Sequence, residues 1–293
     1  MSVTIAIPFF NAEKFLLDAI RSVFAQTHQD WELILVDDGS TDSSLEIARS
    51  VCDPRVRVIS DGKNKKLAAR LNEITQLASY DYIARMDADD LMAPKRIEVQ
   101  LKILSQDKNY DLISCGVYSI GNDNTLRGHR GKKEDSYEFS GILTKKQKFL
   151  HAGLVARKSW YERNRYDESI LVGQDTDLWL RALENADFKA ISIPDLLYMY
   201  REDGNVSKLK LLRAYDLERN KIAARINPLS SRLVFVAKSY LKAFLVLLLD
   251  RFGLLKMLLR LRGTKAPSID IKNNFDFEMN EILSTKIPGI DNG

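Results

Sequence analysis

The stretch VTIAIPFFNAEKFLLDAIRSVFAQTHQDWELILVDDGSTDSS, residues 3–44, contains two mostly apolar runs separated by a helical pattern. Val3 to Pro8 and Glu32 to Val36 are short runs bounded by polar residues, which predicts two buried strands. Between them, apolar residues recur at helical spacing from Ala12 to Gln26. Buried strands that alternate with helices are typical of a parallel sheet covered on both faces.

The same alternation continues along the chain. Thr41 to Ser44 offers N-cap residues for a second helix, and Pro94 suits the first turn of a helix. The remaining predicted elements are strands at residues 56–59, 82–86 and 110–120, a helix at 67–78, a loop or edge hairpin at 121–140, and a glycine-led turn into a helix within 167–183. The predicted fold class is α/β, with a mostly parallel sheet covered by helices and a basic helical extension at the C-terminus.

Composition narrows the class of protein. The 293 residues are 45% hydrophobic, enough for a sizeable core. Cys52 and Cys115 lie far apart without a CxxC pair, and the three histidines lack ligand spacing, which argues against a disulfide framework and a zinc site. We expect His151 to be a core or pocket-wall residue. The first residues lack the features of a signal peptide, so a cytoplasmic location is expected.

Acidic residues follow two of the predicted strands. Asp37 and Asp38 follow the second strand, and Asp87, Asp89 and Asp90 follow the fourth. Crowded carboxylates cost free energy unless a cation or hydrogen-bond donor groups neutralise them. In parallel sheets, ligands bind beyond the carboxyl ends of the strands, where both clusters would meet. We therefore expect a divalent metal site. A solvated acidic turn is the alternative, although independent turns would not need to share one edge.

Four ordered motifs resemble family 2 glycosyltransferases of the GT-A fold. They are residues 3–44, YIARMDADD at 82–90, Pro94 to Arg96, and GQDTDLWLRAL at 173–183, and the likeness covers roughly Val3 to Ser207. The resemblance implies a metal-dependent enzyme that transfers a sugar from a nucleotide diphosphate to an acceptor hydroxyl. It also implies inversion at the anomeric carbon.

The resemblance implies roles for individual residues in donor binding. Asp89 is the expected ligand of Mg²⁺ or Mn²⁺, and Asp87 is expected to face the ribose or the metal shell. Asp38 resembles the aspartate that accepts a hydrogen bond from the base, and the N–H of uracil or thymine suits it. A UDP-sugar donor is therefore expected. Pro8 and Phe10 would line the nucleotide pocket.

The resemblance also suggests a catalytic base. Asp175 matches the family's base, which usually follows a glutamate, whereas Gln174 precedes it here. Asp177 is the local competitor, although two positions along a helix it should point elsewhere.

Two further departures concern metal binding and the nucleotide pocket. After Tyr198 to Arg201 the family often has a histidine that may complete the metal site, whereas this chain continues with Glu202 to Ser207. Asp203 or Glu202 is an alternative oxygen ligand, as are phosphate and water. Lys65 and Lys66 occupy a stretch where many members carry a glycine. No role is assigned to these lysines.

The chain divides into three predicted regions. Residues 1–207 form the catalytic domain, 208–265 a basic amphipathic helical region, and 266–293 a polar, loose tail. From Val206 to Lys265 there are 14 Lys and Arg against 3 Asp and Glu, a net charge of +11. The longest uncharged run, Ala243 to Leu249, is too short to span a membrane.

This basic region predicts a helix lying on an anionic membrane surface. Lys238 and Lys242, and further on Lys256 and Arg260, lie four residues apart on one helical face. The alternative is helices that pack on the catalytic domain or in a homodimer. Nucleic acid is not expected, because the basic residues are interleaved with leucines. The expected location is the inner face of the cell membrane. From the resemblance, the expected acceptor is a polyprenyl-linked glycan, as in capsule or O-antigen polysaccharide biosynthesis.

Three other functions are weighed against this one. A nucleotidyltransferase would need a phosphate loop rich in glycine and arginine after the first strand, and Pro8 to Asn11 has neither. A non-catalytic nucleotide-sugar binder or scaffold would be favoured by loss of Asp89 or Asp175, and both are present. A glycosidase also pairs carboxylates, but it needs neither a metal nor a nucleotide pocket.

Overall fold

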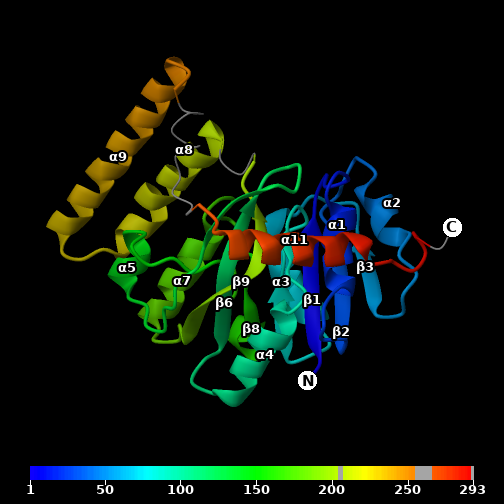
Figure 1. Cartoon of the computed structure of the whole chain (residues 1–293). Helices are drawn as coiled ribbons and strands as arrows, with labels where there is room; N and C mark the ends of the chain where they lie inside the picture. Colours follow the sequence, from blue (N-terminus) through cyan, green and yellow to red (C-terminus); the bar gives the residue numbers. More distant parts are fainter. Residues whose placement is uncertain (204–206, 255–265, 292–293) are drawn as a thin grey trace.

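A computed structural model describes residues 1–203, 207–254 and 266–291. Within these residues, one nine-stranded sheet has the order β3-β2-β1-β4-β8-β6-β9-β5, with β7 paired to β6 (Figure 1). The α/β class with a helix-covered sheet is confirmed.

The first four strands are parallel and follow the predicted alternation. They are β1 Val3–Phe9, β2 Trp31–Asp37, β3 Val56–Ser60 and β4 Tyr82–Arg85, connected by α1 Leu16–Phe24, α2 Ser44–Arg49 and α3 Lys66–Leu77. β1 pairs with both β2 and β4, so the chain reverses its direction of travel across the sheet at β1. The segments that follow these three strands therefore meet at one edge, as the sequence predicted.

The second half of the sheet contains both parallel and antiparallel pairs. Its elements are β5 Leu91–Met92, α4 Arg96–Gln106, β6 Leu112–Ile120, β7 Leu126–Arg130, α5 Phe139–Leu143, β8 Val155–Arg157, α6 Lys158–Arg163, α7 Gln174–Glu184 and β9 Ala190–Arg201. β8 runs antiparallel to β4 and β6, whereas β9 runs parallel to β6 and antiparallel to β5. The predicted strand at 110–120, the edge hairpin after it and the helix after Gly173 are confirmed.

Two helices after the sheet form a hairpin that projects from it (Figure 1). They are α8 Lys208–Leu217 and α9 Leu229–Arg251, joined by a π-helical turn at Glu218–Ile222 and a 3₁₀ turn at Ala223–Arg225. The helical prediction holds for these residues, while Lys256 and Arg260 lie outside the described residues. Within the described part of the chain, no helix is long and apolar enough to cross a membrane. The division after residue 207 stays a prediction.

The prediction of a loose tail is wrong. Residues Ile269–Ser284 form α11, which crosses in front of the sheet in Figure 1. Its buried Phe275, Met279 and Ile282 belong to one apolar cluster with Leu91, Tyr118 and Met199. Beyond the helix, Ile287 is buried in the main core and Asp291 pairs with Arg21 at 3.0 Å. These three apolar residues are spaced three or four positions apart, which is the pattern of an amphipathic helix. The polar composition of the rest of the segment concealed that pattern.

The docking of α11 generates a pH prediction. The Glu278 carboxyl lies beside Tyr118, and burial raises its pKa from 4.5 to about 7, with Glu281 adding repulsion and Lys95 opposing it. The folded chain then binds this proton more tightly than the unfolded chain does. The free energy of unfolding should therefore fall as the pH rises from about 4.5 to about 7.

We expect Glu278→Gln to remove that part of the pH dependence, because glutamine keeps the shape and cannot ionise. The measurement is chemical unfolding of both proteins at about pH 5 and pH 8. Tyr118→Phe is a control that keeps the carboxyl in place. If the intact chain and Glu278→Gln lose equal stability between the two pH values, the assignment is wrong.

Candidate active site

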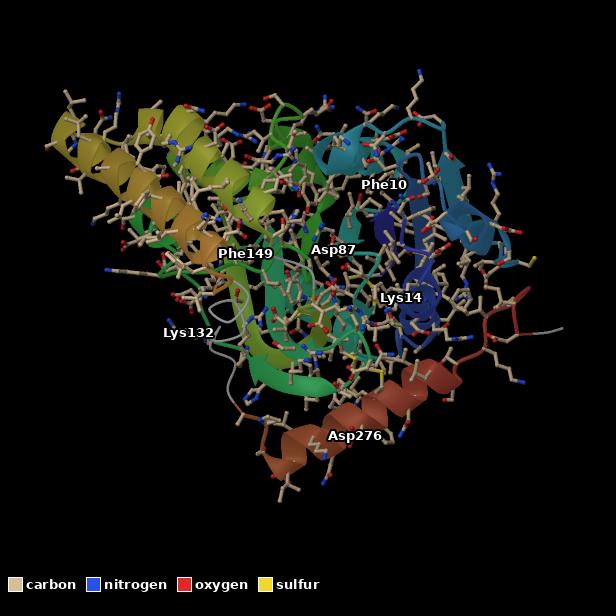
Figure 2. The ribbon with its side chains drawn as sticks, turned by 90° about the horizontal axis from the view of Figure 1, so that it is seen from above. Phe10, Lys14, Asp87, Lys132, Phe149 and Asp276 are labelled. Carbon is tan, nitrogen blue, oxygen red and sulfur yellow. The ribbon has the colours of Figure 1, made fainter. Side chains whose placement is uncertain are left out.

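One cavity of about 340 Å³ lies beyond the carboxyl ends of β1, β2 and β4. All five residues predicted to bind nucleotide or metal line it, namely Pro8, Phe10, Asp38, Asp87 and Asp89. In the view from above, the labelled Phe10 and Asp87 lie near each other, far from Asp276 on α11 (Figure 2). The topology therefore brings together residues that are up to 81 positions apart in the sequence.

Asp38 is held rigidly at the wall of this cavity. Its Oδ1 accepts hydrogen bonds from the backbone N–H of Lys65 at 2.7 Å and of Lys66 at 3.2 Å, and from Arg70 Nε at 2.9 Å. Its Oδ2 accepts from the Lys66 N–H at 3.1 Å. Because each carboxylate oxygen has about two acceptor positions, Oδ2 can accept one further hydrogen bond. This oxygen suits a base N–H.

Arg70 was not predicted from the sequence. It also lines the cavity, its side chain is fully buried, and it pairs with Asp38 at 2.9 Å, Asp61 at 2.7 Å and Glu73 at 2.7 Å. The Arg70 guanidinium, followed by Lys65, holds the pKa of Asp61 well below its usual range. The signal that was available is the i, i+3 spacing of Arg70 and Glu73. The contact with Asp38 is 32 residues away in the sequence.

The acidic motif after β4 is bound by two buried arginines. Arg85 pairs with Asp87, and the Asp87 N–H donates to the hydroxyl of Tyr198 at 3.1 Å. Arg201, at the end of β9, donates its backbone N–H to Asp90 Oδ1 and its Nε–H to the carbonyl of Asp89, both at 2.7 Å. Asp90 is therefore a buried structural residue, while Asp87 and Asp89 remain partly exposed at the cavity.

Excess negative charge remains at this motif. Burial, followed by repulsion from Asp87, raises the pKa of Asp89, although the charges of Arg201 and Lys210 oppose this. A cation between the carboxylates would relieve that repulsion. Their hard oxygen atoms fit Mg²⁺ or Mn²⁺, which needs only one or two protein carboxylates when phosphates supply further ligands. Within the described residues, no group of three or more His, Cys, Asp and Glu could hold a metal alone.

Glu202 and Asp203 are engaged elsewhere. Glu202 pairs with Arg130 at 2.5 Å, and Asp203 pairs with Arg127 through two contacts of 2.6 and 2.7 Å. Both arginines belong to β7, so these carboxylates fix the edge hairpin to the segment after β9. The structure therefore does not favour either one as the replacement for the family's histidine ligand. Residues 204–206 lie outside the described part of the chain.

The two aspartates at the start of α7 have different surroundings. α7 begins after Gly173, whose φ of +82° favours glycine. Asp177 is 2% exposed and pairs with Arg181 at 2.8 Å and Arg225 at 3.5 Å, so it joins α7 to the C-terminal hairpin. Asp175 is partly exposed and makes no ion pair within the described residues. This difference favours Asp175 over Asp177 as a reactive carboxylate.

The charges of Asp175 and Arg85 both act on a polar cluster formed by His151, Tyr166 and Tyr161. His151 Nε2 lies 2.7 Å from the hydroxyl of Tyr166, which donates to Tyr161 at 3.5 Å. Burial, and more weakly the charge of Asp175, raises the pKa of Tyr166 well above its ordinary value, while Arg85 opposes the shift. Burial and Arg85 also lower the pKa of His151 well below its ordinary value, so this histidine is neutral. His151 is therefore a buried polar partner, consistent with the sequence expectation.

Lys66 has a strained backbone beside the cavity. Its φ is +73°, a left-handed backbone conformation that costs free energy for residues other than glycine. The strain has a structural use, because this conformation directs the Lys66 N–H to both oxygens of Asp38. It also explains why glycine suits this stretch in the family that the sequence resembles.

Comparison with known proteins establishes the family. Residues 4–168 match the family model described as "Glycosyl transferase family 2". The chain is 32% identical over 253 residues to the putative glycosyltransferase EpsE of Bacillus subtilis (strain 168), covering 83% of this chain and 89% of that protein. It is 30% identical over 192 residues to the chondroitin synthase of Escherichia coli, covering 65% of this chain and 28% of that protein.

Two solved structures share the fold. S. aureus TarS 1-349 in complex with UDP has a TM-score of 0.61 and 16% identity, covering 82% of this chain and 71% of that one. The mannosyltransferase PcManGT from Pyrobaculum calidifontis, in complex with GDP-Man and Mn²⁺, has a TM-score of 0.58 and 17% identity, covering 97% and 87%. The chain belongs to glycosyl transferase family 2. It is a glycosyltransferase with a GT-A-like fold.

The strained lysine yields a stability prediction. We expect Lys66→Gly to keep or raise the free energy of unfolding by up to about 1 kcal/mol, because relief of left-handed strain offsets the backbone entropy of glycine. Lys65→Gly, at a residue with a φ of −90°, should instead lower it. Chemical unfolding compares the two variants. A larger loss for Lys66→Gly than for Lys65→Gly would contradict the strain argument.

Proposed function

We propose that this chain is a metal-dependent, inverting glycosyltransferase that transfers a sugar from a UDP-sugar to a hydroxyl of a lipid-linked glycan. The observation that carries the proposal is the single cavity lined by Asp38, Asp87 and Asp89. The base of a nucleotide needs an oxygen that accepts a hydrogen bond from it. The ribose needs a polar neighbour, and the diphosphate needs a cation. The three carboxylates provide acceptors and a cation site within one pocket.

The hydrogen bonds of Asp38 favour uracil, or thymine with the same ring N–H, over guanine and cytosine. Oδ1 already accepts three hydrogen bonds, so only Oδ2 is open to a base. Uracil offers one ring N–H between two carbonyl groups, which one oxygen can accept. Guanine presents two adjacent donors, and the ring nitrogen of cytosine carries no hydrogen. The fold alone does not decide the base, because the neighbours of similar fold bind UDP in one case and GDP-Man in the other.

The residues of this site would hold Mg²⁺ or Mn²⁺ through Asp89, with Asp87 near the ribose or in the outer shell. When bound, such an ion stabilises the charge that develops on the leaving diphosphate. Asp87 is fixed by the buried Arg85, so it can orient a ligand without losing side-chain freedom on binding.

Asp175 acts as the general base in this proposal. Its carboxylate accepts the proton of the acceptor hydroxyl while the hydroxyl oxygen bonds to the anomeric carbon. The bond from that carbon to the diphosphate breaks on the opposite side, which inverts the configuration. Asp177 cannot serve, because two arginines hold it in a buried ion pair.

The proposed acceptor is a polyprenyl-linked oligosaccharide of the kind used in bacterial capsule or O-antigen synthesis. Such an acceptor lies at the inner face of the cell membrane, so the enzyme would be a peripheral protein there. The support is the family resemblance together with the basic residues after position 206.

We expect UDP to bind at least roughly tenfold more weakly in EDTA than in Mn²⁺, because the carboxylates then repel its phosphates. Calorimetric titration of the full chain measures both affinities. Asp89→Asn is the matched variant, and its affinity should depend much less on the metal. Equal affinities for the intact chain in the two conditions would remove the metal from the proposal.

Asp175→Asn should leave UDP affinity nearly unchanged and lower turnover by roughly a hundredfold or more, the usual scale for a general base. Turnover is measured as UDP release from the UDP-sugar that binds best. Asp177→Asn is the control, and it should instead lower the free energy of unfolding by about 2 kcal/mol, because two arginines lose their partner. If Asp177→Asn alone abolished turnover in a stable protein, the base would be misassigned.

A further inference from the structure

Helix α9 leaves one broad apolar side in water. The two residues of α9 that are buried are Ser239 and Val246. Ser239 Oγ donates to the carbonyl of Tyr215 on α8 at 3.1 Å, Lys242 pairs with Glu218 at 3.3 Å, and Asp250 pairs with Lys208 at 2.7 Å. These three polar contacts, together with the buried Val246 and with Phe235, which packs on a core cluster, hold α9 against the rest of the protein.

Large apolar residues occupy the opposite side. The most exposed are between 57% and 68% accessible, namely Leu229, Leu233, Tyr240, Leu241, Phe244 and Phe252. At 100° per residue they fall within an arc of about 140° around the helix. Leu247 and Leu248 also fall in this arc and are exposed. We call these eight residues the α9 apolar face.

An ordinary surface helix has one apolar stripe, which faces the core. Helix α9 has a second one, which faces water. A contiguous apolar face of this size marks a surface that binds something, because leaving it in water costs free energy. Figure 1 shows α9 standing away from the sheet, at the end of the molecule opposite α2. Within the described residues, the Arg219 guanidinium stacks over the ring of Tyr240 at 4.6 Å, and all eight residues of the face stay exposed.

Charge distinguishes two possible partners of this face, namely a second copy of the chain and an anionic membrane. Residues 208–254 contain ten Lys and Arg against three Asp and Glu, a net charge of +7. Two copies meeting through this face would bring two such charges together, which opposes association. An anionic lipid leaflet has the complementary charge and an apolar interior.

We propose that α9 lies in the plane of an anionic leaflet with its apolar face at the boundary between head groups and acyl chains. The sequence placed Lys238 and Lys242 on one helical face without showing which way that face turns. Lys242 is turned inward to Glu218, so leucine and phenylalanine make the contact and the basic residues surround it. The surface stands independently of the proposed chemistry, but its use in reaching a lipid-linked acceptor rests on the proposed function.

The position of the α8–α9 hairpin supports a role for this face in reaching a lipid-linked acceptor. Leu217, at the end of α8, lies so near the turn before α7 that a Cβ on Gly173 would come within 2.8 Å of it. Gly173 is two residues from Asp175. A leaflet under α9 would therefore present an acceptor on the side of the site that carries the proposed base.

The test is flotation of the full chain with vesicles of phosphatidylcholine alone or mixed with phosphatidylglycerol. The intact chain should float with the anionic vesicles and less with the neutral ones. The variant Leu241→Gln, Phe244→Gln and Leu248→Gln should bind at least tenfold less. A matched control, Ile269→Gln with Phe277→Gln, removes apolar residues of α11 that are 78% and 71% exposed and should float like the intact chain.

Thermal unfolding and UDP titration of every variant show that folding and the nucleotide site are intact. The proposal is overturned if the intact chain stays unbound at every lipid composition, or if the α9 variant floats as the intact chain does. It is also overturned if the chain is a dimer that the α9 changes separate, since the face is then an interface between copies. Flotation without any UDP affinity would instead defeat the proposed function and leave the membrane surface standing.

Discussion

The acidic motif after β4 depends on two buried arginines. Three carboxylates lie within four residues, and their mutual repulsion would open this turn if nothing opposed it. Arg85 balances Asp87 from within β4, and Arg201 binds Asp90 and the carbonyl of Asp89 from the end of β9. Asp90 is the most buried of the three, and burial followed by repulsion from Asp87 and Asp89 raises its pKa well above the ordinary value. The rest of the site is arranged around this balance.

That balance requires β9 to be in place, and α11 supports it. β5 follows the acidic motif directly and pairs antiparallel with β9 through Leu91 and Met199. Both of these residues belong to the apolar cluster that contains Phe275 and Met279 of α11. The last helix of the chain therefore packs against the strand pair that positions the acidic motif. The polar segment after residue 266 completes the core of the domain that begins at β1.

Local patterns in the sequence predicted the parallel strands well, because β1 and β2 are short, mostly apolar runs that are buried along their whole length. The switch-point rule then placed Asp38, Asp87 and Asp89 at one edge, and all three line one cavity. β5 and β8 have two and three residues, too few for any periodicity to be recognised. Arg70 and Arg201 were missed for another reason: the sequence shows a charge but not its distant partner.

In the basic C-terminal region, the sequence predicted a helix but not which of its sides faces the protein. Its composition correctly indicated an amphipathic helix, but the spacing of Lys238 and Lys242 could not show which side would face the protein. Glu218, 24 residues before Lys242, decides the matter by pairing with it, and it also pairs with Lys145. With Ser239, Lys242 and Asp250 directed to partners outside α9, Leu241, Phe244 and Leu248 lie on the opposite, exposed side.

The hairpin and the catalytic domain are joined at the proposed active site. Arg225, between the two hairpin helices, pairs with both Asp177 and Glu184 of α7, the helix that begins beside Asp175. Lys210 of α8 is close enough for its charge to act on Asp89. A surface that binds the hairpin would therefore also affect α7, which carries the proposed base, and Asp89, which is expected to bind the metal. In an enzyme with a membrane-borne acceptor, this connection would set the distance between the leaflet and the reacting carbon, because the ion pairs of Arg225 fix the hairpin to α7.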